Sequence, residues 1–168
     1  MGTLIPTLAV TLFLTSCMSH PSPHRIQEPY TERQQEVTQR IRQIFLWAKD
    51  RNIAALERSH LETPKFTKFD TVGLDLLDFA QTQAYEKLAF TDDVREFRFD
   101  PAKTIENLKV SVYGDLAVAA FLFHYDATLA DGVDFKKTLR ATLVFLRTAP
   151  GQDGWKIVHE HFSTPMEL

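Results

Sequence analysis

The chain has 168 residues, of which 44% are hydrophobic and 24% charged, and this balance is ordinary for one globular domain. The formal net charge is −3 and no block of Lys and Arg occurs, so we expect no nucleic-acid partner. A single cysteine excludes an intrachain disulfide. The 13 phenylalanines supply apolar bulk for a dense core or for an apolar-walled cavity.

The first residues carry a pattern typical of secretion. Residues 4–14 (LIPTLAVTLFL) are mainly apolar and too few to cross a bilayer. The following Leu14-Thr15-Ser16-Cys17 resembles the lipobox of bacterial lipoproteins, in which the cysteine is lipidated and becomes the new N-terminus. Residues 1–16 contain no Lys or Arg, although secretory signals normally begin with a basic region. An apolar N-terminus with an inert thiol therefore stays open as the alternative.

The lipobox resemblance implies three parts of the chain. Residues 1–16 are a lipoprotein-type signal peptide, and residues 17–30 hold the lipidated Cys17 and a flexible tether rich in proline. Residues 31–168 form the folded domain. Several acyl chains on one residue give stable membrane attachment, so we expect a membrane-anchored lipoprotein on the periplasmic or extracytoplasmic side of the bacterial cell envelope.

The first half of the domain has helical spacing. Thr31 and Gln34 form a capping-box signature. The apolar residues after them recur with the period of an amphipathic helix: Val37, Ile41, Ile44, Phe45 and Ala48. A second short helix is predicted over residues 53–60, before Pro64, and a third over residues 74–90.

The second half of the domain has the period of strands. Leu108, Val110 and Val112 alternate with polar residues, which indicates a strand with one buried face. Apolar runs are separated by three turn signals: Gly114-Asp115, Asp131-Gly132 and Asp153-Gly154. Helices followed by an antiparallel meander predict an α+β fold, with N-terminal helices on one face of a curved antiparallel sheet.

One strand is expected to be covered on both sides. Residues 116–123 (LAVAAFLF) are apolar at every position, so both faces of this strand should be buried. Helices could cover both faces, or helices could cover one face and a second copy of the chain the other. This run therefore supports the expectation of a homodimer through the outer face of the sheet.

The order of elements and four sequence blocks resemble the nuclear transport factor 2-like superfamily, and specifically its SnoaL-like members, over residues 31–165. The blocks are residues 66–70 (FTKFD), residues 113–118 (YGDLAV), residues 140–143 (RATL) leading into 145–147 (FLR), and residues 155–163 (WKIVHEHFS). The resemblance implies a cone in which the sheet wraps around the long helix and leaves a cavity at its open end. Members include isomerases, cyclases, dehydratases and many proteins that only bind, so the fold assigns no reaction.

The last block raises the question of which residues face the cavity. Period two gives one face Trp155, Ile157, His159, His161 and Ser163, and the other face Lys156, Val158, Glu160 and Phe162. Periodicity does not decide which face is inward. In similar proteins the face that bears the tryptophan lines the core, which implies that the two histidines and the serine reach the cavity. The alternative is that a backbone carbonyl or a carboxylate satisfies the histidines, which then have a purely structural role.

We therefore predict a ligand site made of His159, His161, Ser163, Arg140 and Tyr125. Arg140 could pair with an anionic ligand if it shares the cavity. Within the FTKFD block, Phe66 and Phe69 are expected to plug the base of the cone and Lys68 and Asp70 to face solvent, with a pocket role for Asp70 as the alternative.

Two functional hypotheses follow. The first is a lipid-anchored domain that binds a small organic ligand or a partner in a Phe-lined cone, without catalysis. The second is a small-molecule enzyme of isomerase, dehydratase or hydrolase type, with His161 or His159 as the general base and Ser163 or Tyr125 steadying the developing charge. Two histidines on one strand lack the third protein ligand that a zinc site needs, so we predict neither a metal nor a cofactor.

Overall fold

The computed structural model describes residues 28–71, 73 and 75–165. Helical elements are α2 (Thr31–Lys49), α3 (Ile53–Glu57), α4 (Phe79–Leu88), the π turn η1 (Ala89–Asp93), α5 (Pro101–Thr104) and the 3-10 turn η2 (Gln152–Gly154). Strands are β1 (Thr67–Phe69), β2 (Val94–Phe97), β3 (Ile105–Tyr113), β4 (Leu116–Leu129), β5 (Asp134–Arg147) and β6 (Trp155–Ser163). The predicted signal peptide, Cys17 and most of the tether lie outside the described residues. No helix within the described ranges is long and apolar enough to cross a membrane.

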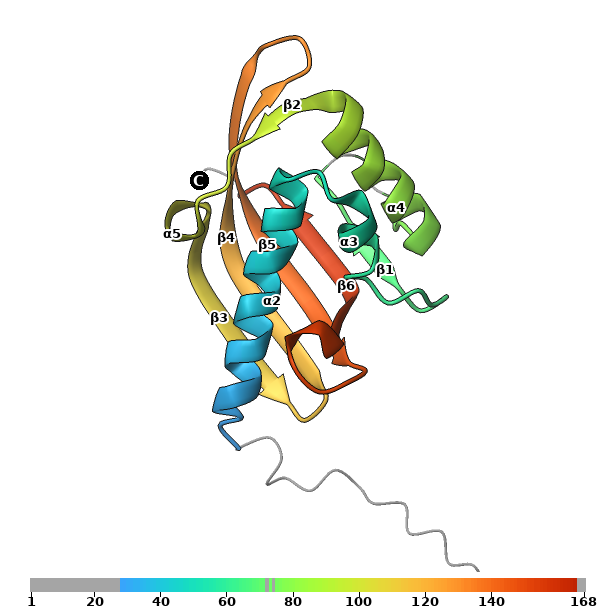
Figure 1. The fold of residues 1–168 in the computed structure, drawn as a ribbon, viewed down its shortest axis with the longest axis vertical. Helices are drawn as coiled ribbons and strands as arrows, with labels where there is room; N and C mark the ends of the chain where they lie inside the picture. Colours follow the sequence, from blue (N-terminus) through green and yellow to red (C-terminus); the bar gives the residue numbers. More distant parts are fainter. Residues whose placement is uncertain (1–27, 72, 74, 166–168) are drawn as a thin grey trace, which may run out of the picture.

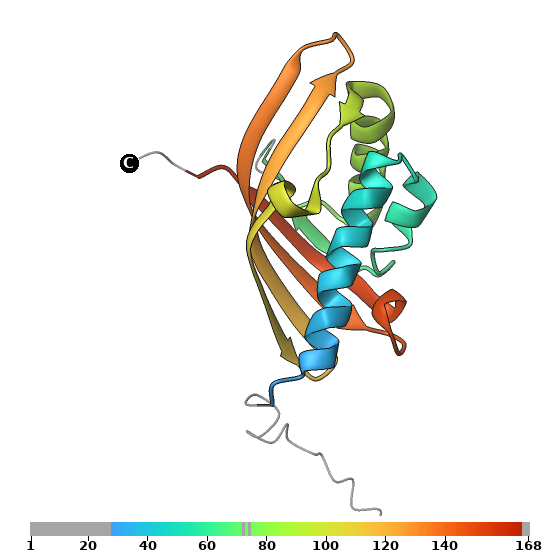
Figure 2. The ribbon, with the colours of Figure 1, turned by 60° about the vertical axis from the view of Figure 1, so that its left-hand side comes forward.

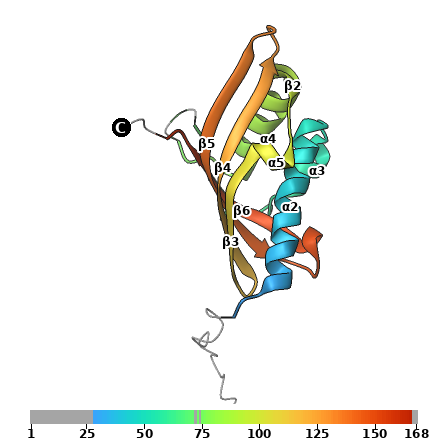
Figure 3. The ribbon, with the colours of Figure 1, turned by 90° about the vertical axis from the view of Figure 1, so that its left-hand side faces the viewer.

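The strands form one curved sheet of six strands, in the order β1-β6-β5-β4-β2, with β3 also paired to β4. All pairs are antiparallel except β1 with β6, which is parallel. Helices α2, α3 and α4 lie on one side of the sheet, and the other side is left open by the described chain (Figures 1, 2 and 3). The predicted α+β class is confirmed, and the sheet is mixed because of the short edge strand β1.

The helices begin and end at different residues from those expected. Helix α2 begins at Thr31, and its N-cap residue is Tyr30, whose side chain makes no capping hydrogen bond. The capping box predicted from Thr31 and Gln34 is therefore absent. A capping box does start α4, where Asp78 and Gln81 exchange bonds. This cap explains why the third helix begins at residue 79 rather than near residue 74.

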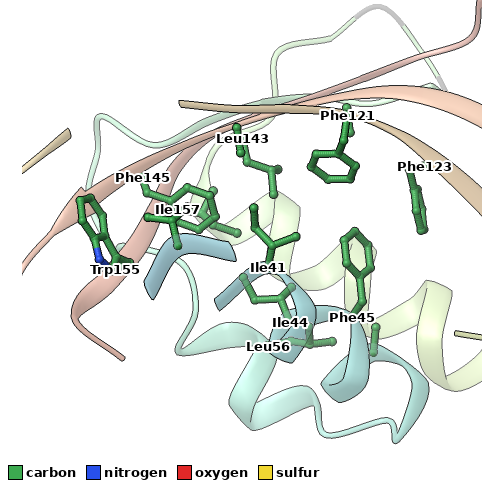
Figure 4. Close-up of a cluster of buried hydrophobic side chains, with 14 of the residues drawn as sticks. Ile41, Ile44, Phe45, Leu56, Phe121, Phe123, Leu143, Phe145, Trp155 and Ile157 are labelled. Carbon is green, nitrogen blue, oxygen red and sulfur yellow. The ribbon is translucent and has the colours of Figure 1, made fainter. Parts of the chain in front are cut away.

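The core lies between α2 and the concave face of the sheet (Figure 4). From α2 come Ile41, Ile44 and Phe45, and they meet inward residues of three strands: Phe121 and Phe123 of β4, Leu143 and Phe145 of β5, and Trp155 and Ile157 of β6. The Phe45 ring stacks on the Phe123 ring with centroids 4.6 Å apart. Two of the predicted turns are confirmed, since Gly114 and Gly132 take the positive φ that few other residues adopt.

A β-bulge in β6 decides which of its residues face the helices. Phe145 pairs with Ile157, whereas the neighbouring Val144 pairs with His159. Val158 is therefore the extra residue of the bulge, and the alternation of faces shifts by one position after it. Trp155 and Ile157 are fully buried under the helices, and Glu160 is also buried. His161 is exposed on the open face of the sheet. The expectation that the histidines share the inward face of Trp155 is therefore wrong.

The open face of the sheet carries exposed apolar side chains. Leu116 pairs across the strands with Tyr113 on one side and with Leu146 on the other, and all three are exposed. The inward residues of the same strand, Ala117 and Ala119, are fully buried. Residues 116–123 are thus buried only on the helix side within the described chain, and the homodimer through the open face stays a prediction.

Candidate functional site

A cavity of about 320 Å³ lies between α2, the α4–η1 segment and the concave face of the sheet, and its size is typical of sites for small molecules. Its walls are mainly apolar and include five phenylalanines: Phe45, Phe90, Phe123, Phe135 and Phe162. The segment η1 that closes one side is a π turn, a form that often occurs at functional sites. The chain thus encloses a space that can hold an apolar body.

The floor of the cavity is charged. We use the name charge cluster for five side chains there: His60, Lys68, Asp70, Glu86 and Glu160. The Lys68 Nζ atom lies 2.9 Å from Glu160 Oε2, 3.0 Å from Glu86 Oε1 and 3.5 Å from Asp70 Oδ2. The His60 Nε2 atom lies 3.1 Å from Glu160 Oε1 and 3.6 Å from Glu86 Oε1. The exposed fractions of these side chains are only 1–14%, so the charges compensate one another rather than being solvated.

The fold brings the cluster together from separate parts of the chain. Parallel pairing of β1 with β6 sets Lys68 directly opposite Glu160. His60 follows α3 and forms a bridge with Ile157 of β6, while its Nδ1 lies 3.0 Å from the Leu56 carbonyl oxygen, to which it donates. Glu86 reaches the cluster from α4. The cluster therefore joins two strands, the segment that follows α3 and the last turn of α4.

The electrostatics of the cluster keep its cations charged. Burial alone would lower the pKa of His60, but the carboxylates of Glu86 and Glu160 outweigh it and raise the pKa to about 8. Burial likewise opposes the charge of Lys68, yet Glu160, Glu86 and Asp70 hold its pKa well above the usual value. Burial would raise the pKa of Glu160, and the adjacent Lys68 and His60 instead lower it. At neutral pH both cations and the Glu160 carboxylate are therefore ionised.

Other polar side chains also line the cavity. Tyr85, Asp93, Tyr125 and Lys137 all line it. Burial, followed by Tyr85 and Asp93, raises the pKa of Tyr125 to about 12, so its hydroxyl stays protonated. Its ring stacks on the Phe97 ring, with centroids 5.4 Å apart. Tyr125 is the one predicted site residue that the structure places in the cavity wall.

The remaining predicted site residues of the domain lie away from the cavity. His159 Nδ1 is 2.8 Å from the Thr67 hydroxyl oxygen at the sheet surface. Arg140 is exposed and pairs in register with Ser163, and His161 pairs with the next outward residue, Thr142. None of the four lines the cavity, because the bulge turns the end of β6 around and because Arg140 projects from the open side of β5. Whether they bind a ligand on that face stays a prediction.

Sequence reasoning missed most of the charge cluster. Lys68 was expected to face solvent, but only 4% of it is exposed, because β1 pairs with β6 and its alternation turns Lys68 inward between Thr67 and Phe69. Phe66 is buried as expected. Phe69 is exposed, with its ring centroid 5.9 Å from that of His161. One feature of the sequence could have indicated the cluster. Lys68 is the single cation of the FTKFD block, and in a strand it lies on the face opposite to that of Thr67 and Phe69.

The cluster also contains potential metal ligands. Among the described residues, the only set of three with ligand atoms within 4.8 Å of one another is His60, Glu86 and Glu160. The Lys68 ammonium already lies 2.9–3.0 Å from the same two carboxylates. A divalent ion would have to displace this ammonium, whose raised pKa opposes its loss of charge. In this arrangement Lys68 takes the place of a bound cation.

Comparison with known proteins assigns the class. The model of the SnoaL-like domain family matches residues 37–167, so the chain belongs to this family. No curated protein matches the chain.

Solved structures share the fold. A nuclear transport factor 2-like superfamily protein from Salmonella enterica serovar Typhimurium is 22% identical with a TM-score of 0.68, covering 82% of this chain and 94% of that one. A putative dehydratase from the nuclear transport factor 2-like family of Streptomyces avermitilis is 17% identical with a TM-score of 0.69, covering 82% of this chain and 99% of that one. A putative ketosteroid isomerase from Shewanella frigidimarina is 19% identical with a TM-score of 0.58, covering 76% and 94%. At these identities the likeness shows the fold alone.

The pKa values of two histidines are expected to shift in opposite directions, upward for His60 of the charge cluster and downward for His159 on the sheet. His60 should titrate near pH 8. Burial and the neighbouring His161 lower the pKa of His159, so it should titrate below 6.5. Because the folded-state pKa of His60 exceeds its unfolded value of 6.5, its stabilisation is fully present below pH 6.5 and is lost as the pH rises through 8. This loss should amount to about 2 kcal/mol of unfolding free energy.

Histidine NMR chemical shifts followed from pH 5 to 9 measure both values, and the His60→Gln variant assigns the His60 resonance. A His60 that titrates at or below its ordinary value would contradict the close approach of the two carboxylates.

Proposed function

We propose that the domain binds a small, largely apolar organic molecule in the cavity between α2 and the α4–η1 segment. The carrying observation is the combination of phenylalanine walls with a buried charged floor in a space of about 320 Å³. Apolar walls with a few polar groups at fixed positions are typical of sites that bind and orient small ligands. Two proteins with the same fold are described as a putative dehydratase and a putative ketosteroid isomerase, and these descriptions are consistent with a small organic ligand.

Binding is favoured over catalysis by the state of the ionisable groups. His159 and His161 lie outside the cavity walls, so neither is in place to act as the general base on a molecule held there. His60 lies in the cavity floor, but one ring nitrogen faces a backbone carbonyl and the other faces Glu160. A general base needs a free acceptor within reach of the substrate proton, and none of these three histidines offers one in the cavity. We therefore propose a binding domain rather than an enzyme with a histidine base.

Filling the cavity should weaken binding. Ala89 lines the cavity, whereas Ala120 is exposed on the open face of the sheet. We expect the neutral dye N-phenyl-1-naphthylamine to bind the wild-type domain with enhanced fluorescence. The Ala89→Phe variant should bind it at least about tenfold more weakly, since the new ring takes the space of the dye. The matched Ala120→Phe variant should bind like the wild type. Equal binding by all three proteins would contradict a ligand site in this cavity.

We also propose that Cys17 is lipidated and anchors the domain to a membrane of the bacterial cell envelope. Support comes from the apolar run at residues 4–14, from the small residues before Cys17 and from the proline-rich tether after it. The open face of the sheet, with exposed Tyr113, Leu116 and Leu146, is the proposed contact for a second copy of the chain.

Lipidation is tested by metabolic labelling. In a bacterial host grown with radioactive palmitate, the wild-type chain should be labelled and should partition into the detergent phase. The Cys17→Ala variant should lose the label and move to the aqueous phase, because no other residue supplies a thiol. A Ser19→Ala variant in the tether should behave as the wild type does. Detection of an unlabelled wild-type chain with a free Cys17 thiol would refute the anchor.

A further inference from the structure

The cations of the charge cluster are already surrounded by acceptors of the protein. An ammonium has three N–H donors, and three carboxylates lie within 3.5 Å of Lys68 Nζ. Protonated His60 has two donors, and these are matched by the Leu56 carbonyl oxygen and by Glu160 Oε1. A ligand that offers acceptors, such as a carboxylate, would therefore have to compete with these protein acceptors for the donors of the cluster.

One carboxylate does retain hydrogen-bonding capacity. Glu86 Oε2 is buried and has no hydrogen-bond partner. Both oxygens of Glu160, by contrast, already face a cation, with Oε1 3.1 Å from His60 Nε2 and Oε2 2.9 Å from Lys68 Nζ. A buried carboxylate oxygen without a donor is unfavourable. What the floor lacks is a donor.

The net charge of the cluster also favours a cationic ligand. Two cations, His60 and Lys68, face three carboxylates, Asp70, Glu86 and Glu160, which leaves a net charge of −1 when all five are ionised. The other charged residues of the cavity, Asp93 and Lys137, offset each other. An anionic ligand would add to the excess negative charge, whereas a cation would neutralise it.

The walls suit a cation as well. Ammonium groups are attracted to aromatic faces, and the Phe162 ring already lies beneath the Lys68 ammonium, with the Nζ atom 5.5 Å from the ring centroid. The rings of Phe90, Phe123 and Tyr125 line the same cavity. Aromatic walls next to an acidic floor are a combination that recognises organic amines.

We propose that the ligand of this cavity is an organic amine that is protonated at neutral pH, with an apolar body against the phenylalanines and an ammonium group paired with Glu86. The inference rests on the proposed binding function of the cavity. Glu86 and Asp70 are the most exposed members of the cluster, at 12% and 14%. A rotation of the Glu86 side chain, which projects from α4 at the edge of the cluster, brings its unpartnered oxygen to the ligand.

Three probes of nearly equal shape test the charge of the ligand. Tryptamine, tryptophol and indole-3-propionate present a cation, a neutral hydroxyl group and an anion on the same ring system. Each is titrated at pH 7 against the domain loaded with N-phenyl-1-naphthylamine, and dye displacement gives the affinity. Tryptamine should bind at least about tenfold more tightly than indole-3-propionate, because a charged hydrogen bond contributes about that factor. Tryptophol should fall between them.

Substitutions of single carboxylates show which residue is responsible for the tighter binding of tryptamine. Glu86→Gln keeps the size of the side chain and should reduce the advantage of tryptamine to about threefold or less, while tryptophol binding stays the same. Asp70→Asn should weaken tryptamine binding independently. The control, Glu57→Gln, alters an exposed carboxylate outside the cavity and should leave all three affinities unchanged.

The outcomes separate the two proposals. If the dye binds but tryptamine binds no more tightly than indole-3-propionate, the amine ligand is refuted and the cavity site stands. An advantage of tryptamine that survives in both Glu86→Gln and Asp70→Asn would also refute it. If the dye does not bind at all, the binding function fails and the amine ligand fails with it.

Discussion

The Lys68 ammonium is shared by carboxylates from two other elements of the fold, and the arrangement of the cavity depends on this contact. Lys68 comes from the edge strand β1, Glu160 from β6 and Glu86 from α4. Among the described residues of α4, only Thr82 is fully buried, and Phe79 at the start of the helix packs against the core, so the far end of α4 at Glu86 has little apolar packing. Removing one partner of a buried ion pair leaves an uncompensated charge, which costs about 3–5 kcal/mol. The ion pairs therefore fix the helix that forms one wall of the cavity.

The sequence predicted the architecture well and the site poorly, and the reasons are physical. Hydrophobic period reveals a long amphipathic helix such as α2 because its buried stripe is repeated over several turns. Hairpins can be recognised in the sequence because glycines such as Gly114 and Gly132 adopt the positive φ that few other residues take. The hydrophobic period does not reveal a bulge, since inserting Val158 changes no local propensity and yet reverses every later side chain of β6. For this reason the side chain of Glu160 reaches the cavity, whereas the side chains of His159 and His161, which the sequence had suggested, do not.

The second gap is tertiary. A three-residue strand such as β1 has too few positions to show alternation, and its pairing with β6 joins residues about ninety positions apart. The burial of Lys68 follows from that pairing rather than from its neighbours in the sequence. His60 and Glu86 likewise acquire their roles only when α3 and α4 pack over the sheet. In the resulting floor the cations are surrounded by acceptors and the Glu86 Oε2 atom has no partner, a property that exists only in the assembled fold and that directs the choice of ligand.

The central claim is that Lys68 and Glu160 stabilise the domain through each other, and a double-mutant cycle of Lys68→Met and Glu160→Gln measures this. Urea unfolding should give a large loss for Lys68→Met, about 3–5 kcal/mol, because three carboxylates are left together. The double variant should be no less stable than Lys68→Met, with a coupling energy of at least about 2 kcal/mol. Losses that add to within about 0.5 kcal/mol would show that the two side chains do not interact, and the charged floor described here would then be wrong.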